Sequence, residues 1–281
     1  MYRLLAFDLD GTLLDDKKNL PEENRLALIE AANRGMVLVP ATGRILRGIP
    51  EVIKELPFIR YYIVSNGAAV FDAKEGKTLY QADVPLDLAL RTYDYLDTLP
   101  VIYDCYQDEI GWMSRAMYER CPPYFAYEPG ILDLVNRLRI RVEDFKGTLR
   151  KKGRPLQKLQ MYFLPEDEEE RQRQLKRIPE LFPDLVATTS VSNNIELNHV
   201  DADKGKAMLA LARVLGIGRE ETLAFGDGSN DSSMLRAAGW GVAMANSNPD
   251  VKAAADEVTA SNNDAGVAKA LRRILAKEEN L

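Results

Sequence analysis

The stretch Leu4-Leu5-Ala6-Phe7-Asp8-Leu9-Asp10-Gly11-Thr12 decides the fold. Four apolar residues in a row predict a buried strand, and two aspartates follow where that strand ends. Open α/β sheets bind ligands at the carboxyl ends of their strands, so we expect both carboxylates at a binding edge. Asp8 could form a covalent ester, and Asp10 could protonate a leaving alcohol and later activate water. A plain Asp-Gly turn that closes a strand would give the same short pattern.

The first eighty residues continue as an alternation of strands and helices. A helix is predicted to open at Pro21, and further strands are predicted at 36–39 and 61–64. The strand at 36–39 leads into Thr42-Gly43-Arg44 and a predicted second helix, whose N-terminus could cradle a phosphate. Successive buried strands that end in polar, glycine-bearing loops predict a site assembled at one sheet edge.

A segment of different character interrupts this alternation. Residues 84–190 combine a helix near 85–98 with several short strand-like pieces, and the strand and helix alternation returns afterwards. We therefore predict an α/β protein with a Rossmann-like, doubly wound and mostly parallel core. Residues 1–83 and 191–281 would form this catalytic core, and 84–190 would be an inserted α+β cap domain.

A second acidic stretch, Gly226-Asp227-Gly228-Ser229-Asn230-Asp231, also follows an apolar strand directly. Two strand ends that each deliver an aspartate can share a cation, and oxygen ligands without His or Cys favour Mg²⁺. Asp231 would also be stabilised in a first helical turn whatever else it does. Lys204 opens a helix beside Gly205, where a positive charge and a glycine are both unfavourable. Such a local cost indicates another purpose, for example neutralising a phosphoryl oxygen.

Composition excludes several function classes. The 281 residues carry a net charge of −6, which does not support nucleic acid as the main partner. One histidine cannot build a two-histidine phosphatase or a multi-histidine zinc site, so carboxylates must carry the chemistry. Charged residues interrupt the first apolar segment, and no apolar run reaches membrane-spanning length. We expect a cytoplasmic protein with no membrane partner, either a monomer or a weak homo-oligomer.

Two features leave alternatives open. His199 is more readily a structural or surface residue than a catalytic one, because no partner group can be named for it. The basic residues between 137 and 154 could meet an anionic part of a substrate, although such runs are more often solvated faces.

Four stretches, taken in order, resemble the motifs of the haloacid dehalogenase-like superfamily. They are Asp8-Leu9-Asp10-Gly11-Thr12, Ala41-Thr42-Gly43-Arg44, Lys204-Gly205 and Gly226-Asp227-Gly228-Ser229-Asn230-Asp231. Ser65-Asn66-Gly67-Ala68 and Gly239-Trp240-Gly241-Val242-Ala243-Met244 extend the resemblance. Within the superfamily the chain is similar to the Cof-type phosphatases, whose type IIB cap is inserted between the second and third core motifs.

The resemblance implies a Mg²⁺-dependent phosphatase that hydrolyses small phosphomonoesters, such as sugar phosphates, through an aspartyl-phosphate. Asp8 would be the nucleophile and Asp10 the general acid and base. The Asp8 carboxylate, the Asp10 backbone carbonyl and Asp227 would hold Mg²⁺. A phosphosugar mutase on the same fold, or a non-catalytic phosphate-binding regulatory module, remains an alternative.

The remaining motif residues receive supporting roles from the same resemblance. Thr42, Gly43, Arg44, Lys204 and Asn230 would bind the phosphoryl group of a small phosphorylated metabolite, and Asp231 would orient Lys204 or a metal-bound water. The cap would choose the leaving group of the substrate.

Overall fold

The computed structural model describes residues 1–127 and 129–278, which divide into two compact units. Unit 1 comprises Met1–Gln81 and Ala202–Leu281, and unit 2 comprises Ala82–Asp201. Unit 2 is therefore an insertion in the sequence of unit 1. Within the described residues, no helix is long and apolar enough to cross a membrane.

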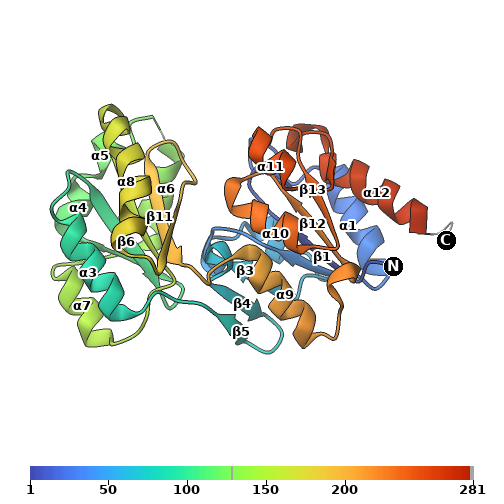
Figure 1. Cartoon of the computed structure of the whole chain (residues 1–281), viewed down its shortest axis with the longest axis horizontal. Coiled ribbons are helices and arrows are strands. Elements are labelled where there is room, and N and C mark those ends of the chain that lie inside the picture. The colour runs from blue at the N-terminus through green and yellow to red at the C-terminus, as the bar shows by residue number, and fades with distance from the viewer. Residues whose placement is uncertain (128, 279–281) are drawn as a thin grey trace. The chain divides into compact units, whose positions relative to one another are not determined.

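A five-stranded parallel sheet in the order β14-β13-β12-β1-β2 forms the centre of unit 1 (Figure 1). Its strands are β1 (Leu4–Phe7), β2 (Val37–Pro40), β12 (Thr222–Gly226), β13 (Trp240–Ala243) and β14 (Glu257–Val258). The chain extends this sheet from β1 to β2 on one side and later from β12 to β14 on the other. The strand order therefore reverses between β1 and β12, and such a switch point is where open α/β sheets bind ligands.

A small antiparallel meander continues the sheet beyond β2. Strands β3 (Tyr61–Val64), β4 (Ala69–Asp72) and β5 (Lys77–Gln81) form a three-stranded sheet, and a parallel bridge between Ala41 and Ile63 links β3 to the end of β2. The sequence predicted β3 as a third parallel strand, and its strand end does lie next to that of β2. It did not predict β4 and β5.

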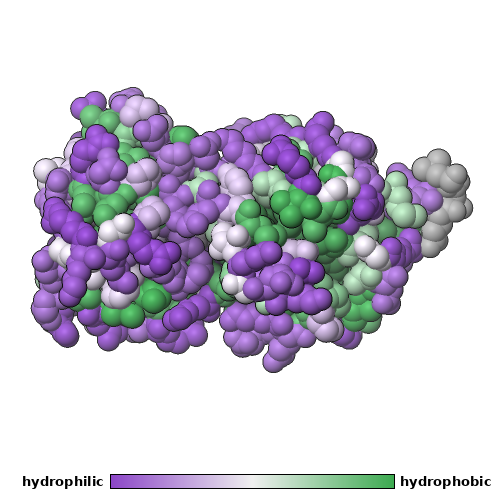
Figure 2. Space-filling view, turned by 90° about the horizontal axis from the view of Figure 1, so that it is seen from below, coloured by the Kyte–Doolittle hydropathy of each residue, from purple (hydrophilic) through white to green (hydrophobic). Residues whose placement is uncertain are grey.

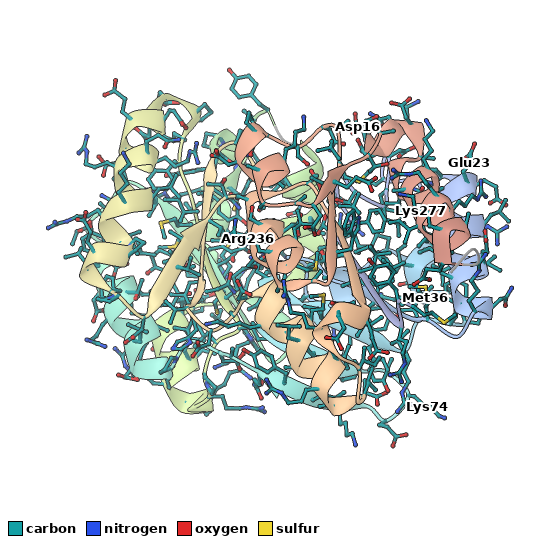
Figure 3. The ribbon with its side chains drawn as sticks, turned by 45° about the vertical axis from the view of Figure 1, so that its right-hand side comes forward. Asp16, Glu23, Met36, Lys74, Arg236 and Lys277 are labelled. Atoms are coloured by element: carbon teal, nitrogen blue, oxygen red, sulfur yellow. The ribbon has the colours of Figure 1, made fainter. Side chains whose placement is uncertain are left out.

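Helices cover both faces of the parallel sheet, as a doubly wound fold requires. Alternate strand residues point to opposite faces, so Leu5 and Phe7 pack with α1 (Glu22–Asn33) and α12 (Gly266–Glu278), whereas Leu4 and Ala6 face the other way. The second face is covered by α9 (Lys204–Val214), α10 (Ser232–Ala237) and α11 (Pro249–Ala253). Figure 3 labels Glu23 on α1 and Lys277 on α12, on the side of the sheet away from Arg236 on α10. The predicted α/β core is confirmed.

The helix expected directly after Arg44 is not formed. The chain makes a short 3₁₀ turn, Leu46–Gly48, followed by the four-residue helix α2 (Glu51–Lys54). Pro50 has no N–H to donate, and a residue that precedes proline avoids the helical region, so a continuous helix cannot cross this segment. The prediction of a helix N-terminus behind Thr42-Gly43-Arg44 is therefore wrong.

Unit 2 is built on a six-stranded mixed sheet in the order β10-β11-β9-β6-β7-β8. The strands are β6 (Ile102–Gln107), β7 (Ile110–Ser114), β8 (Arg139–Val142), β9 (Lys158–Tyr162), β10 (Leu185–Thr188) and β11 (Asn194–His199). The helices are α3 (Leu86–Leu96), α4 (Arg115–Glu119), α5 (Cys121–Tyr124), α6 (Pro129–Leu138), α7 (Phe145–Lys152) and α8 (Glu168–Leu181). This is the α+β architecture expected for the insertion.

The second boundary of the insertion lies later than the sequence predicted. We expected the core to resume at residue 191, but β11 (Asn194–His199) pairs antiparallel with both β9 and β10 of unit 2. Apolar Ile195 and Leu197 enter the core of unit 2, while Asn194 and Glu196 alternate with them. That alternation is typical of an antiparallel strand, so the boundary falls at Ala202.

Several of the basic residues of 137–154 take part in ion pairs. Arg137 pairs with Asp133 and Lys146 pairs with Asp94, and each bond has at least one exposed side chain. Arg139 is the exception, because its guanidinium is buried against Asp104. The prediction of a solvated face describes most of this segment, and it fails at Arg139.

Figure 2 shows hydrophilic residues over most of the visible face, interrupted by smaller apolar areas. His199 makes a local contact, in which the Asp201 backbone N–H donates to Nδ1 at 3.2 Å. This contact fits the structural role that we expected for the imidazole.

Candidate active site

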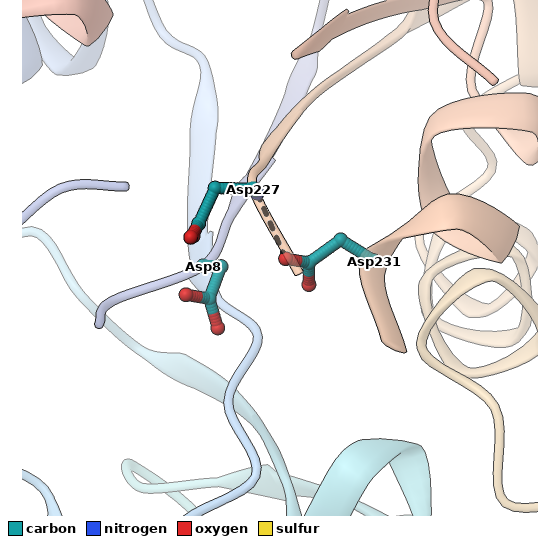
Figure 4. Close-up of side chains that lie close together, drawn as sticks. All are labelled: Asp8, Asp227 and Asp231. Atoms are coloured by element: carbon teal, nitrogen blue, oxygen red, sulfur yellow. Dashed lines mark hydrogen bonds between the residues drawn. The ribbon is translucent and has the colours of Figure 1, made fainter. Parts of the chain in front are cut away.

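The two acidic stretches meet at the switch point of the unit 1 sheet. Phe7 and Phe225 are register partners in the parallel strands β1 and β12, and the Asp8 N–H donates to the Phe225 carbonyl at 3.0 Å. Asp8 and Asp227 therefore follow adjacent strand ends. Figure 4 shows their carboxylates close together, with Asp231 beside them. The sequence predicted this convergence from the apolar runs that precede each stretch.

Lys204 is the cation at the centre of this cluster. Its side chain is completely buried, and Nζ donates to Asp8 Oδ1 at 2.7 Å and to Asp231 Oδ1 at 2.6 Å. Asp203 caps the helix by accepting from the Lys206 N–H. A Cβ on Gly205 would lie 2.6 Å from the Ser233 carbonyl oxygen, so glycine lets α9 approach α10 closely. Both unfavourable residues at this helix start thus have a structural reason.

Asp231 binds Lys204 and also fixes the backbone of the second acidic loop. Its Oδ2 atom accepts from the backbone N–H groups of Asp227 at 3.0 Å and Gly228 at 2.8 Å, and Figure 4 draws the first of these bonds. Asp231 is 1% exposed. The structure thus brings Asp231 to Lys204, one of the two partners that the resemblance implied for it.

Two residues that the sequence did not select hold Asp227. Thr12 Oγ1 donates to Asp227 Oδ1 at 2.7 Å. Asn246 Nδ2 donates to Asp227 Oδ2 at 3.4 Å and to the Gly11 carbonyl at 2.8 Å. Gly11 has φ +86°, and a Cβ there would lie 2.4 Å from Asp227 Oδ2, so glycine is required. Asn246 follows β13, and the strand-end argument used for Asp8 and Asp227 would have found it.

Burial and mutual repulsion disfavour the charged forms of these acids. Burial raises the pKa of Asp227 to about 6, and the Asp231 charge adds to the effect. Burial and the neighbouring carboxylates raise the pKa of Asp8, although Lys204 opposes the rise. Burial lowers the pKa of Lys204, but the charges of Asp231 and Asp8 outweigh it and leave the pKa raised. The cluster thus holds three carboxyl groups against the one ammonium group of Lys204.

This surplus suits a hard divalent cation. Asp8, Asp227 and Asp231 each offer a carboxylate oxygen, and these three atoms lie within 4.8 Å of one another. All donors are oxygens, which Mg²⁺ prefers. Because Asp231 already accepts from Lys204 and two backbone N–H groups, Asp8 and Asp227 are the better ligands.

The Asp10 carboxylate lies outside this cluster and is held by two cations. Arg44 donates from Nε to Oδ2 at 2.7 Å and from Nη2 to Oδ1 at 2.8 Å, and Lys18 Nζ lies 2.9 Å from Oδ1. Burial raises the pKa of Asp10, but these partners outweigh it and lower the pKa to about 2. The structure thus places the Arg44 guanidinium, which the resemblance assigned to the phosphoryl group, on the Asp10 carboxylate. The sequence could not show this pairing, because it joins two loops 34 residues apart.

The other predicted phosphate-binding residues lie near one another in unit 1. Thr42 is 1% exposed, and its Oγ1 accepts from the Arg44 N–H at 3.2 Å. Asn230 Nδ2 donates to Asn66 Oδ1 at 3.0 Å, and a Cβ on Gly43 would lie 2.7 Å from that same oxygen. Asn66, in the loop after β3, therefore contacts both Asn230 and the Thr42–Arg44 turn.

Known proteins resemble this chain over nearly its whole length. The profile of the family described as haloacid dehalogenase-like hydrolase matches residues 5–271. Phosphatase YwpJ of Bacillus subtilis is 31% identical over 297 residues, which cover 97% of this chain and 100% of YwpJ. The HMP-PP phosphatase of Serratia proteamaculans is 32% identical over 257 residues, which cover 90% of this chain and 87% of that enzyme.

Solved structures share the fold described above. The structure of the HAD subclass IIB sugar phosphatase BT4131 has a TM-score of 0.82 and 25% sequence identity, and it covers 97% of this chain and 98% of its own. The arrangement of a doubly wound core with an inserted sheet domain is therefore found in proteins with known structures.

Proposed function

We propose that this chain, which belongs to the haloacid dehalogenase-like hydrolases and is a phosphatase of that family, depends on Mg²⁺ and hydrolyses small phosphomonoesters. One observation carries the proposal: the Asp8 carboxylate lies at the switch point, bound by Lys204 and beside Asp227. A carboxylate on a rigid strand end, next to a fixed cation, suits attack on a phosphoryl group.

Asp8 would attack phosphorus, so that the bond from phosphorus to the ester oxygen breaks and an aspartyl-phosphate forms. Asp10 would give a proton to the leaving alkoxide and would later take a proton from the water that attacks the aspartyl-phosphate. The second step releases inorganic phosphate and restores Asp8. In the structure Asp10 is held ionised by Arg44 and Lys18, which is the form that accepts a proton from water. Its role as an acid requires substrate binding to loosen that hold.

Mg²⁺ would be held by the Asp8 and Asp227 carboxylates and the Asp10 backbone carbonyl. The oxygen-only donor set and the closeness of its three carboxyl groups support this assignment. When bound, the ion would offset negative charge on the carboxylates and on the phosphoryl group. Lys204, Thr42 and Asn230 would bind the phosphoryl oxygens, and the Gly43 backbone would approach them closely.

The substrate would be a small phosphorylated metabolite, with sugar phosphates as the first class to test. The names of the related proteins support this class: one is a sugar phosphatase and another an HMP-PP phosphatase. We further propose that unit 2 acts as the cap and selects the leaving group. A panel of phosphorylated metabolites, ranked by kcat/KM, would identify the preferred class.

Release of inorganic phosphate from para-nitrophenyl phosphate tests the function. We expect Mg²⁺-dependent release by the wild type and a loss of at least about a thousandfold in Asp8→Asn. Asp250→Asn, an exposed acid on α11, is the matched control and should keep wild-type activity. Equal activity in Asp8→Asn would contradict the mechanism. Transfer of phosphoryl groups between sugars without phosphate release would show a mutase instead.

A further inference from the structure

The loop that follows β3 has an unusual backbone. Ser65, Asn66 and Gly67 have φ values of 51°, 61° and 94°, so three successive residues adopt the left-handed conformation. Asn tolerates this conformation better than most residues, whereas Ser rarely adopts it. Strain of this kind persists only where the surroundings impose it, and it gathers at functional sites.

Two segments of the candidate site impose this conformation on the loop. On one side, the Ser65 N–H donates to the Arg44 carbonyl at 2.9 Å and the Asn66 N–H donates to the Thr42 carbonyl at 3.0 Å. On the other side, a Cβ on Gly67 would lie 2.4 Å from the Asp203 carbonyl carbon, directly before Lys204. The loop is therefore fixed between the Thr42–Arg44 turn and the N-terminus of α9.

The Asn66 side chain extends this link to a third segment. It is 5% exposed, and its Oδ1 accepts from Asn230 Nδ2 at 3.0 Å. One of the two Nδ2 hydrogens of Asn230 is thereby committed to Asn66, which fixes the plane of the Asn230 amide. The same Asn66 oxygen lies so close to Gly43 that a side chain there would displace it.

We propose that Asn66 is a positioning residue that orients the Asn230 amide toward the phosphoryl group of the substrate. The proposal rests on the proposed phosphatase function. Asn66 does not itself contact the reacting atoms in this role. The left-handed backbone of Asn66 fixes the position of its side chain. The hydrogen bond between the two amides then restricts the orientation of the Asn230 side chain.

A double-mutant cycle tests the proposal, with hydrolysis of para-nitrophenyl phosphate in Mg²⁺ and inhibition by inorganic phosphate as the two readouts. Asn66→Gly keeps the left-handed conformation and removes the amide. We expect it to lower kcat/KM and to weaken phosphate inhibition, each by about tenfold, as for the loss of one hydrogen bond to a developing charge. Asn230→Ala should have an effect of similar size, and the double variant should be no worse than Asn230→Ala alone.

Two further variants separate positioning from a general structural role. Ala265→Gly also relieves a left-handed non-glycine residue in unit 1, with φ 53°, and should keep wild-type kcat/KM. Asn66→Asp keeps an acceptor for Asn230 and also tolerates the left-handed conformation. In the Asn66→Asp background, Asn230→Ala should still cost about tenfold, whereas in the Asn66→Gly background it should cost little. The Asn66→Asp background can be measured even if Asn66→Gly does not fold.

The outcomes distinguish the two proposals. A wild type without phosphatase activity would overturn the proposed function. An active wild type whose Asn66→Gly variant has unchanged kcat/KM, or whose Asn66 and Asn230 effects simply add, would overturn the positioning role alone. An Asn66→Asp background that is insensitive to Asn230→Ala would do the same.

Discussion

The two units both bury charged side chains, but they balance the charges differently. In unit 2, Asp104 pairs with Arg139 at 2.7 Å and Glu196 pairs with Lys158 at 2.9 Å, so each buried acid in these pairs has a buried base. In unit 1, Lys204 alone lies against Asp8 and Asp231, with Asp227 beside them. The difference teaches that buried charge by itself does not mark a site. An unbalanced surplus does, because it stabilises a ligand of opposite sign.

Among the changes that test this comparison, the largest expected effect comes from removing Lys204, the cation of the unit 1 cluster. Lys204→Met should lower kcat/KM for para-nitrophenyl phosphate by about a hundred- to a thousandfold, because a preorganised charge at the phosphoryl group is lost. Lys269→Met, at an exposed position on α12, is the control and should behave as wild type. Activity within tenfold of wild type in Lys204→Met would break the comparison, since the central lysine would then be structural only.

Breaking a balanced pair in unit 2 should affect stability. Arg139→Met leaves Asp104 buried without its base, and we expect a loss of about 3–5 kcal/mol in the free energy of unfolding. Urea denaturation followed by Trp112 fluorescence, in a Trp240→Phe background, reports on unit 2. Arg137→Met removes an exposed pair with Asp133 and should cost at most about 0.5 kcal/mol. A similar small effect for both variants would mean that the buried pair does not stabilise unit 2.

Removing an acid from the unit 1 cluster should increase the stability of the metal-free protein, in contrast to the loss expected for Arg139→Met. The pKa of Asp227 is raised from 3.8 to about 6, so its ionised form destabilises the metal-free protein above pH 6, and this cost fades as the pH falls toward 4. With a chelator present, Asp227→Asn should be more stable than wild type by about 1–3 kcal/mol at pH 7.5 and equal to it near pH 4.

Trp240 fluorescence in a Trp112→Phe background follows this change, with Asp250→Asn as the control. A variant that is less stable than wild type at pH 7.5 without metal would contradict the surplus. Added Mg²⁺ should reverse the order, because only the wild type gains stability from tight binding.

Local patterns in the sequence predicted the part of the site that lies at strand ends. Apolar runs directly before Asp8 and Asp227 predicted β1 and β12, and parallel pairing then required the two acids to meet. The cost of Lys204 at a helix start indicated a purpose other than helix formation, and the structure places its side chain on Asp8 and Asp231. By contrast, the bonds from Arg44 to Asp10 and from Asn66 to Asn230 join loops that no local pattern relates.

The two predictions of the fold that were wrong concern the helix after Arg44 and the second boundary of the insertion, and local sequence features bear on both. Pro50 prevents the helix after Arg44, and the alternation of Asn194, Ile195, Glu196 and Leu197 indicates an antiparallel strand. The pairing partners of that strand, which decide its unit, are set by tertiary contacts. Sequence periodicity does not contain them.

Calorimetric titration with Mg²⁺ tests the central claim most directly, that the surplus of carboxylates at the β1 and β12 strand ends holds a divalent cation. The account predicts one Mg²⁺ bound per chain in the wild type and in Asp250→Asn. Asp227→Asn should bind at least about tenfold more weakly, because it loses a charged ligand. Binding of equal strength in Asp227→Asn, or no binding in a wild type that hydrolyses para-nitrophenyl phosphate, would contradict it.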